Sequence, residues 1–266
     1  NKSEQLDGYQ LNLFCCKQDT AEKLEKQGFL LRVIRPNVVL PEVQQDYWKS
    51  VLYKYDFAKN FIETWEYTST KTSEDWKSYQ SALNCYFLSQ NENYSAEIRF
   101  ASIRKAIELI YTINPALQNI SRLQTAIRIL ADFGIRVTAL QVLQQLITQV
   151  KKSDDIKPDE PFIPPLRRFE RIEPPKGKLK KWCLAGLLEQ FEKLFGFSGY
   201  FTGLKSLENL EKINSLGFQS AEMERRLQLL RIVHKKQVKP ILTEQLKTKT
   251  EDNLNNDIWV DWKLTV

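Results

Sequence analysis

The sequence predicts a mainly α protein, an irregular stack of helices in two lobes, with a small α/β element formed by strands near the two ends of the chain. Apolar residues recur at three- and four-residue spacing through most of residues 42–237, as on one face of an amphipathic helix. A proline-rich stretch at residues 153–177 interrupts this pattern. Near both ends of the chain, apolar residues alternate with polar ones, which is typical of strands.

Length and composition limit the class of protein. The chain has 266 residues, 42% of them hydrophobic and 27% charged, so it can fold around one large core or two small ones. No apolar run approaches the ~20 residues that cross a bilayer, so we expect no membrane span. The four cysteines form no CxxC pair, which favours reduced thiols in the cytoplasm. The first residues lack a signal core, and we expect the chain to be a piece of a longer protein.

The start of the chain predicts a strand, a short helix and a second strand. Tyr9–Cys16 alternates apolar and polar residues, and Asp19 and Glu22 are spaced as a capping box. Gly28 would end the helix, and Phe29–Arg35 would form the second strand. Because two strands alone are marginally stable, this piece is interpreted as the edge of a larger α/β sheet.

One long amphipathic helix is predicted over Glu42–Glu66, which completes a first segment of residues 1–66. Its apolar stripe consists of Tyr47, Val51, Tyr55, Ala58, Ile62 and Trp65.

Residues 67–152 are predicted to form the first helical lobe. Ser73 can cap a helix whose buried face would hold Trp76, Tyr79, Leu83 and Phe87. Further helices are expected over Ala96–Tyr111, Ser121–Phe133 and Ile135–Lys151. The last two resemble one tetratricopeptide hairpin, because Gly134 stands where two helices would approach closely. The consensus tryptophan is missing, so the pattern predicts an irregular stack and not a regular array.

Residues 153–177 are predicted to form an arm that packs along the helices. Prolines remove backbone donors and favour extended conformation, so this stretch must be a linker or a wrapping arm. A free linker would seldom carry as many bulky apolar groups as Phe162, Ile163, Leu166 and Phe169 provide, so we expect these side chains to be buried.

A second helical lobe is predicted at residues 178–239, followed by a polar tail and a terminal strand at residues 240–266. In the lobe, Gly217 would end one helix and Ser220 would cap the next. The terminal strand places Ile258, Val260, Trp262, Leu264 and Val266 on one face, and we expect it to pair with a strand near the start of the chain.

Five segments carry a resemblance to a known group of proteins: RFASIRKAIELI, RLQTAIRILADFGIRVTALQVLQQLI, PFIPPLRRFE, FGFSGYFTG and GFQSAEMERRLQLLR. They resemble the C-terminal helical regions of large bacterial proteins, cyanobacterial ones included, that carry FkbM-type methyltransferase or glycosyltransferase modules. The resemblance implies a parent enzyme that uses S-adenosylmethionine or transfers a sugar, with the strand-helix-strand piece of residues 1–66 as the end of its α/β catalytic domain. It places no catalytic residue on this chain, because the segments are packing patterns and the sequence has no glycine-rich cofactor turn.

No residue stands out as catalytic, cofactor-binding or metal-binding. His234, the single histidine, lies near a predicted helix end, where an imidazole is more often structural. The glycines at positions 196, 199 and 203 lack the Lys-Ser/Thr of a phosphate loop and are interpreted as an interhelical turn that Phe195, Phe197, Tyr200 and Phe201 anchor in the core. The acidic pairs Asp154-Asp155 and Asp159-Glu160 are interpreted as solubilising charges on the arm.

The most basic stretch gives the one candidate for ligand contact. Six side chains there could meet an anionic surface: Arg167, Arg168, Arg171, Lys178, Lys180 and Lys181. The net charge of the whole chain is only +6, and no nucleic-acid-binding motif accompanies the stretch, so a solvated or interdomain basic face ranks first.

The sequence therefore favours a non-catalytic accessory role without a cofactor. In this interpretation the chain positions the catalytic module of its parent enzyme, the acceptor or another protein partner. The alternatives are a stand-alone helical protein-interaction scaffold and a weak binder of nucleic acid or an anionic surface. A complete enzyme would need a concave pocket with convergent polar groups, which the sequence does not reveal.

Overall fold

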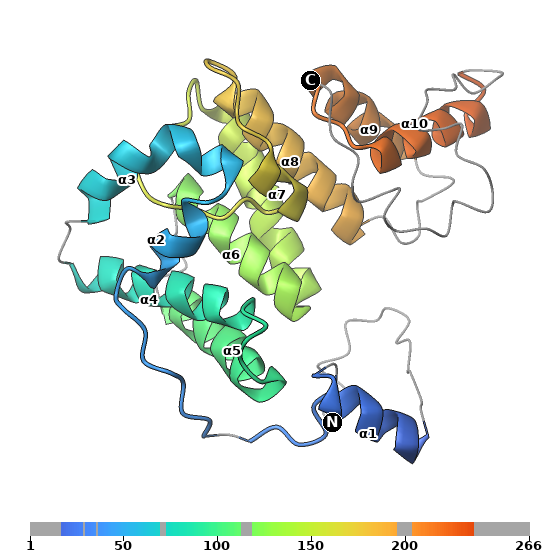
Figure 1. The fold of residues 1–266 in the computed structure, drawn as a ribbon. Helices are drawn as coiled ribbons and strands as arrows, with labels where there is room; N and C mark the ends of the chain where they lie inside the picture. The colour runs from blue at the N-terminus through green and yellow to red at the C-terminus, as the bar shows by residue number, and fades with distance from the viewer. Residues whose placement is uncertain are drawn as a thin grey trace.

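The computed structural model describes residues 17–28, 30–35, 37–69, 73–112, 119–195 and 204–236. Within these ranges the chain is mainly helical and contains no strand (Figure 1). The elements, with η for 3₁₀ segments, are α1 (Gln18–Lys26), α2 (Tyr47–Leu52), η2 (Asp56–Phe61), α3 (Ile62–Ser69), α4 (Glu74–Ser89), α5 (Ala96–Thr112), α6 (Ile120–Phe133), α7 (Arg136–Lys152), η3 (Arg167–Arg171), α8 (Leu179–Phe195), α9 (Leu204–Leu216) and α10 (Ala221–Val233).

Helices α4 to α10 form an irregular stack in chain order. Each of them contacts the next one along the chain, and α2 packs on α4. In Figure 1, α6, α7 and α8 lie side by side in the middle of the molecule, with α9 and α10 beyond α8. Helix α1 lies at the edge, where Arg99 Nη2 of α5 donates a hydrogen bond to the Gly28 carbonyl (3.2 Å). The predicted mainly helical fold is confirmed, and the contacts between successive helices fit the predicted irregular stack; the likeness to a tetratricopeptide hairpin stays a prediction.

Several helices begin and end where the sequence predicts. Ser73 Oγ accepts a hydrogen bond from the backbone N–H of Trp76 (3.3 Å) at the start of α4. At the start of α10, Ser220 Oγ accepts one from the N–H of Met223 (3.3 Å). Gly134 ends α6 with a φ of +93°, a left-handed conformation that would cost another residue about 1 kcal/mol or more. The predicted buried face of α4 is also confirmed, since Trp76, Tyr79, Leu83 and Phe87 are all buried.

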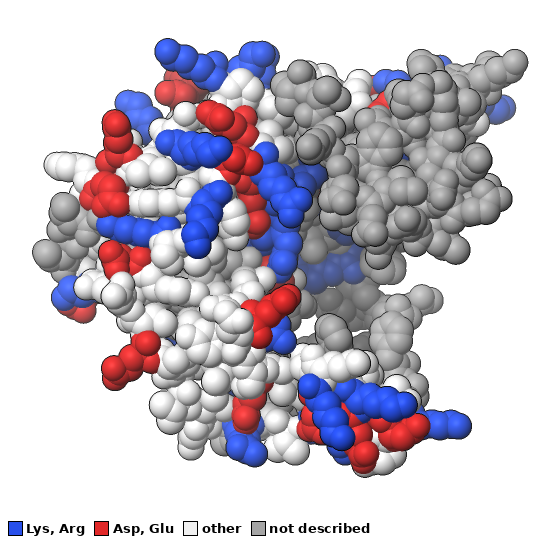
Figure 2. All heavy atoms as spheres, viewed as in Figure 1, with Lys and Arg blue, Asp and Glu red and all other residues white. Residues whose placement is uncertain are grey.

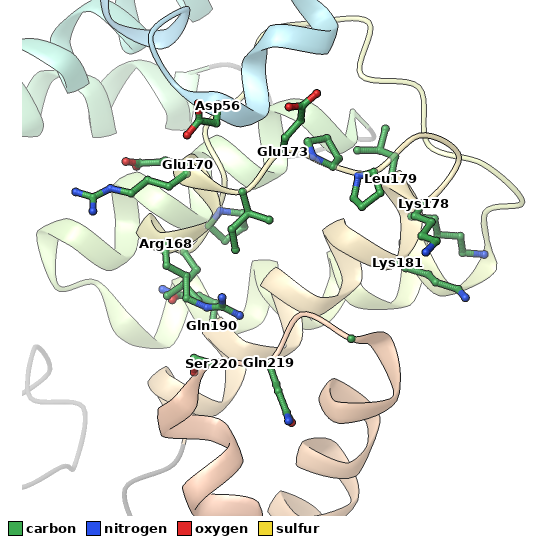
Figure 3. Close-up of a pocket in the computed structure, with 18 of the residues that line it drawn as sticks. Asp56, Arg168, Glu170, Glu173, Lys178, Leu179, Lys181, Gln190, Gln219 and Ser220 are labelled. Atoms are coloured by element: carbon green, nitrogen blue, oxygen red, sulfur yellow. The ribbon is translucent and has the colours of Figure 1, made fainter. Parts of the chain in front are cut away.

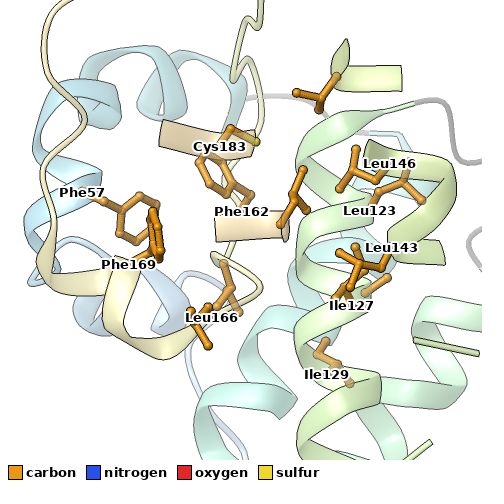
Figure 4. Close-up of a cluster of buried hydrophobic side chains, with 14 of the residues drawn as sticks. Phe57, Leu123, Ile127, Ile129, Leu143, Leu146, Phe162, Leu166, Phe169 and Cys183 are labelled. Atoms are coloured by element: carbon orange, nitrogen blue, oxygen red, sulfur yellow. The ribbon is translucent and has the colours of Figure 1, made fainter. Parts of the chain in front are cut away.

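One hydrophobic cluster includes residues from before, within and after the proline-rich arm (Figure 4). Phe162 of the arm lies between Phe57 of η2 and Trp65 of α3, with ring centroids 5.3 Å and 5.7 Å from its own. Phe169 of η3 meets the edge of Trp182 of α8 at 5.3 Å. The arm therefore lies inside the core that it shares with α8, and the division of the chain into two lobes stays a prediction.

The predicted burial of the arm is confirmed. Phe162 and Phe169 are each 1% exposed, and Ile163 and Leu166 are buried as well. Phe169 can approach α8 closely because position 186 is glycine: a β-carbon there would lie 3.4 Å from the ring.

Side chains of the helices bind the arm's backbone, which has no regular ladder of its own. Tyr79 Oη donates a hydrogen bond to the Pro161 carbonyl (2.7 Å), and Trp65 Nε1 donates one to Pro158 (3.0 Å). Farther along, Arg128 Nη1 binds the Pro164 carbonyl (3.0 Å) and Trp182 Nε1 binds that of Ile172 (3.0 Å). Because buried carbonyls need donors, these four side chains fix the course of the arm.

The single long helix predicted over Glu42–Glu66 is wrong. The chain instead forms α2, η2 and α3, with a break at residues 53–55. Trp48 and Phe57 both belong to the core and are fully buried. Their nine-residue separation would put them on opposite faces of a continuous helix of about 3.6 residues per turn. The break therefore turns Phe57 back toward the core.

The capping box predicted near the start of the chain is wrong. Helix α1 begins at Gln18, Lys17 precedes it at the N-cap position without a side-chain capping hydrogen bond, and Gln18 Nε2 donates a hydrogen bond to Glu22 Oε1 (3.0 Å). Residues 30–35 form no strand and bend at Arg32. The small α/β element is thus unconfirmed. Gly28 does end α1 as predicted, with a φ of +76°.

Some predictions fall outside the described residues. These are the strand Tyr9–Cys16, the terminal strand with residues 258–266, and the glycine segment with Phe197, Tyr200 and Phe201. Phe195 is described, and its predicted place in the core is wrong, because its side chain is 44% exposed. In the ranges that the structure covers, no helix is both long and apolar enough to cross a membrane.

Candidate functional site

An open cleft of about 2680 Å³ lies where the arm, the start of α8 and the turn between α9 and α10 face one another (Figure 3). Residues 165–181 form one wall, and residues 217–224 form the opposite one. Asp56 and Asn60 of η2 and the segment that follows α7 complete the rim. A second pocket, beside residues 31–40 and α5, has a volume of only about 140 Å³, so the cleft is taken as the candidate site for a ligand.

Turn residues in the sequence position both walls. Pro174 and Pro175 keep the end of the arm extended, and Gly177, with a φ of +72°, lets the chain reverse into α8. On the opposite wall, Gly217 ends α9 with a φ of +82° and Ser220 caps α10. The side chains of Gln219 and Ser220 lie across the cleft from Lys178 and Leu179 in Figure 3.

Ion pairs hold the inner part of this wall in place. Arg128 of α6 binds Asp132 (3.0 Å) and also Glu170 of η3. Burial raises the pKa of the Glu170 carboxyl above its usual value, because desolvation outweighs the attraction of Arg128. Arg168 binds Glu189 of α8 (2.6 Å), whose side chain is fully buried, and also the Phe218 carbonyl on the opposite wall.

The structure separates the six predicted cationic residues into two groups. Arg167 binds Asp132 (2.9 Å), Arg168 binds Glu189, and Lys180 Nζ donates to the Ser153 carbonyl. These three therefore have a large part of their hydrogen-bonding capacity used inside the molecule. The remaining three are exposed and form no ion pair with any described residue: Arg171, Lys178 and Lys181.

Lys176 belongs with the second group, although it was not among the six predicted residues. It is exposed, lines the cleft and has no ionic partner in the described ranges. We call Arg171, Lys176, Lys178 and Lys181 the basic rim. Figure 2 shows Lys and Arg side chains gathered in the middle of this face, along the edge of a hollow, with Asp and Glu side chains beside them. The sequence located this basic stretch, but it could not tell which cations have internal partners.

Other sequence candidates lie away from the cleft. His234 ends α10, as predicted, and does not line the cleft. Burial raises the pKa of the Cys85 thiol to about 11 and that of Cys183 to about 12, so neither is a ready nucleophile. Within the described ranges, no group of three His, Cys, Asp or Glu residues could hold a metal ion.

The interpretation of Glu160 as a solubilising charge is wrong. Its side chain is 7% exposed and binds Arg122 of α6 through both carboxylate oxygens (2.6 Å and 3.1 Å). Asn119 Nδ2 donates a third hydrogen bond to this carboxylate (3.1 Å). The apolar run that directly follows Glu160 was the signal for burial, because a carboxylate beside buried residues needs a partner.

Comparison with protein-family models, with curated proteins and with solved structures gave no match to this chain. The fold and the cleft describe a mainly helical chain with a packed arm beside one large cleft that is lined by many charged side chains.

Proposed function

We propose that this chain is a non-catalytic helical scaffold that binds a segment of a protein partner in the cleft between the arm and the α9–α10 turn. The observation that carries the proposal is the construction of the cleft. It is open and large enough for a peptide, and its walls, which carry many charged side chains, are held in place by buried ion pairs and carbonyl contacts of the arm.

Preorganised walls favour binding, because little side-chain or loop freedom is lost when a partner arrives. The arm is fixed by Arg128 and Trp182, and Arg168 spans from the arm to the opposite wall at Phe218. The described lining contains neither histidine nor cysteine, and two of its carboxylates, Asp132 and Glu170, are bound by Arg128. The resemblance adds the expectation that the partner belongs to a methyltransferase or glycosyltransferase, and this stays a prediction.

A library of random linear peptides displayed on phage tests the scaffold role. We expect enriched peptides to shift the backbone amide NMR signals of residues 168–181 and 217–224. Replacement of Gln219, whose side chain lies at the cleft in Figure 3, by tryptophan should then weaken binding about tenfold by steric exclusion.

The matched control is Gln145→Trp on the exposed face of α7, which lies outside the cleft and should leave the affinity unchanged. If no peptide is enriched, or if enriched peptides bind the Gln219→Trp variant as well as the original chain, the scaffold role is wrong.

A further inference from the structure

We infer that the segment bound in the cleft is acidic and docks on the basic rim of Arg171, Lys176, Lys178 and Lys181. This inference rests on the proposed function and names the chemistry of the partner. It follows from the difference between the cations of the cleft that bind a carboxylate of this chain and those that do not.

The basic rim is the part of the cleft whose cations are free to meet a ligand. Its four side chains are exposed and form no ion pair with a described residue. By contrast, Arg128, Arg167, Arg168 and Lys193 of the same cleft each bind a carboxylate of this chain. Residues 171–181 carry five basic side chains and one acidic one, so the local charge is positive. A ligand that enters here meets uncompensated positive charge.

Two lysines of the rim, Lys178 and Lys181, lie together at one end of the cleft. In Figure 3, Lys178 and Lys181 point to the same side at the start of α8, and Asp56 and Glu170 lie on the other side of the cleft. The first turn of α8 contains no acidic residue that would offset the helix dipole. Lysines near a helix N-terminus are unfavourable by themselves, and a carboxylate from a partner would remove this repulsion.

The rest of the lining favours a polypeptide over a nucleic acid. Asp154, Asp155 and Glu224 line the same cleft without an ion pair to any described residue. A nucleic-acid backbone carries a negative charge at every nucleotide, so these carboxylates would repel it within a Debye length of about 8 Å. Phe61 is the one aromatic side chain in the described lining, which leaves no row of stacking platforms for bases. A peptide can place its acidic residues opposite the rim alone.

The test uses fluorescence anisotropy with the complete chain and labelled probes. The first probe is a peptide in which glutamate alternates with serine and leucine, and the second replaces every glutamate by glutamine. Oligouridylate and vesicles that contain phosphatidylserine serve as the nucleic-acid and membrane probes. We expect the glutamate peptide to bind more tightly than the other three, and its affinity to fall as sodium chloride is added.

Charge reversal then locates the contact. The variant K178E/K181E should bind the glutamate peptide about tenfold more weakly, because two rim cations become anions. The matched control K54E/K212E changes the net charge equally at exposed lysines that do not line the cleft, and should bind within about twofold of the original chain. Circular dichroism of both variants checks that the helices are retained.

Each result bears on one of the two proposals. Equal affinity for the glutamate and glutamine peptides, or equal weakening by both variants, overturns the acidic partner while the scaffold role stands. Tighter binding of oligouridylate or of the vesicles also overturns it, in favour of that class of ligand. Failure of every peptide, together with an empty phage selection, overturns the scaffold role itself.

Discussion

The Glu160 carboxylate and the Arg122 guanidinium illustrate what a single charged pair does in this protein. Both side chains are nearly buried, at 7% and 9% exposure, so their charges have lost most of their water. The loss is offset by two hydrogen bonds between the pair, the bond from Asn119 and a further contact of Arg122 with Asp75. The pair links the arm to α6. Removing one partner is costly, because the other charge stays buried without compensation.

At this scale we predict that Glu160→Gln lowers the free energy of unfolding by about 2 kcal/mol or more, since Arg122 stays buried with Asp75 as its one remaining charged partner among the described residues. Urea denaturation followed by circular dichroism measures the change. The control Glu74→Gln removes a carboxylate that is 86% exposed and paired with Lys77, and should cost no more than ~0.5 kcal/mol. Equal midpoints for the two variants would contradict the role given to Glu160.

The arm is the element on which both the core and the cleft depend. Its prolines prevent it from pairing with its own backbone, so it takes hydrogen bonds from Tyr79, Trp65 and Arg128 on the helices. Its apolar side chains complete the core that α3, α6 and α8 leave open. Phe162 contributes most, because its ring lies among Phe57, Phe61, Trp65 and Trp182.

We therefore predict that Phe162→Ala destabilises the protein by about 3 kcal/mol or more, the range for truncating a buried aromatic side chain. Thermal and urea unfolding measure it. Tyr111→Ala on α5, where the ring is 52% exposed, should cost less than ~1 kcal/mol. An unchanged midpoint for the Phe162 variant would mean that the arm does not stabilise the helical stack.

At the scale of the whole molecule, segments far apart in the sequence make the cleft together. The end of the arm, the start of α8 and the α9–α10 turn converge, and Arg168 spans the two walls through Glu189 and the Phe218 carbonyl. The lining mixes acidic and basic side chains, with few aromatic or small residues that would enclose a cofactor. Such a surface suits an extended polypeptide better than an adenosine or a sugar nucleotide.

We accordingly predict that the chain binds neither S-adenosylmethionine nor a nucleotide sugar. Isothermal titration calorimetry should give only heats of dilution, while a cofactor-binding methyltransferase titrated in parallel gives a saturable curve. Micromolar binding of either ligand by this chain would overturn the non-catalytic assignment and would require a cofactor site that the described residues do not reveal.

The sequence by itself determined the local features. Helix caps at Ser73 and Ser220, the glycine at position 134 and the apolar face of α4 are where the pattern predicts them, because caps and periodicity act over a few neighbouring residues. The burial of the arm could also be predicted from the sequence, because burying its aromatic side chains away from water is favourable.

Tertiary structure alone decided how these elements meet. It breaks the predicted helix of residues 42–66 so that Trp48 and Phe57 reach the same core, and it buries Glu160 against Arg122. It also separates the cations with internal partners, such as Arg168, from the free ones of the basic rim. The physical reason is that burial and ion pairing depend on which distant side chains lie within a few ångströms, and local sequence patterns do not contain that information.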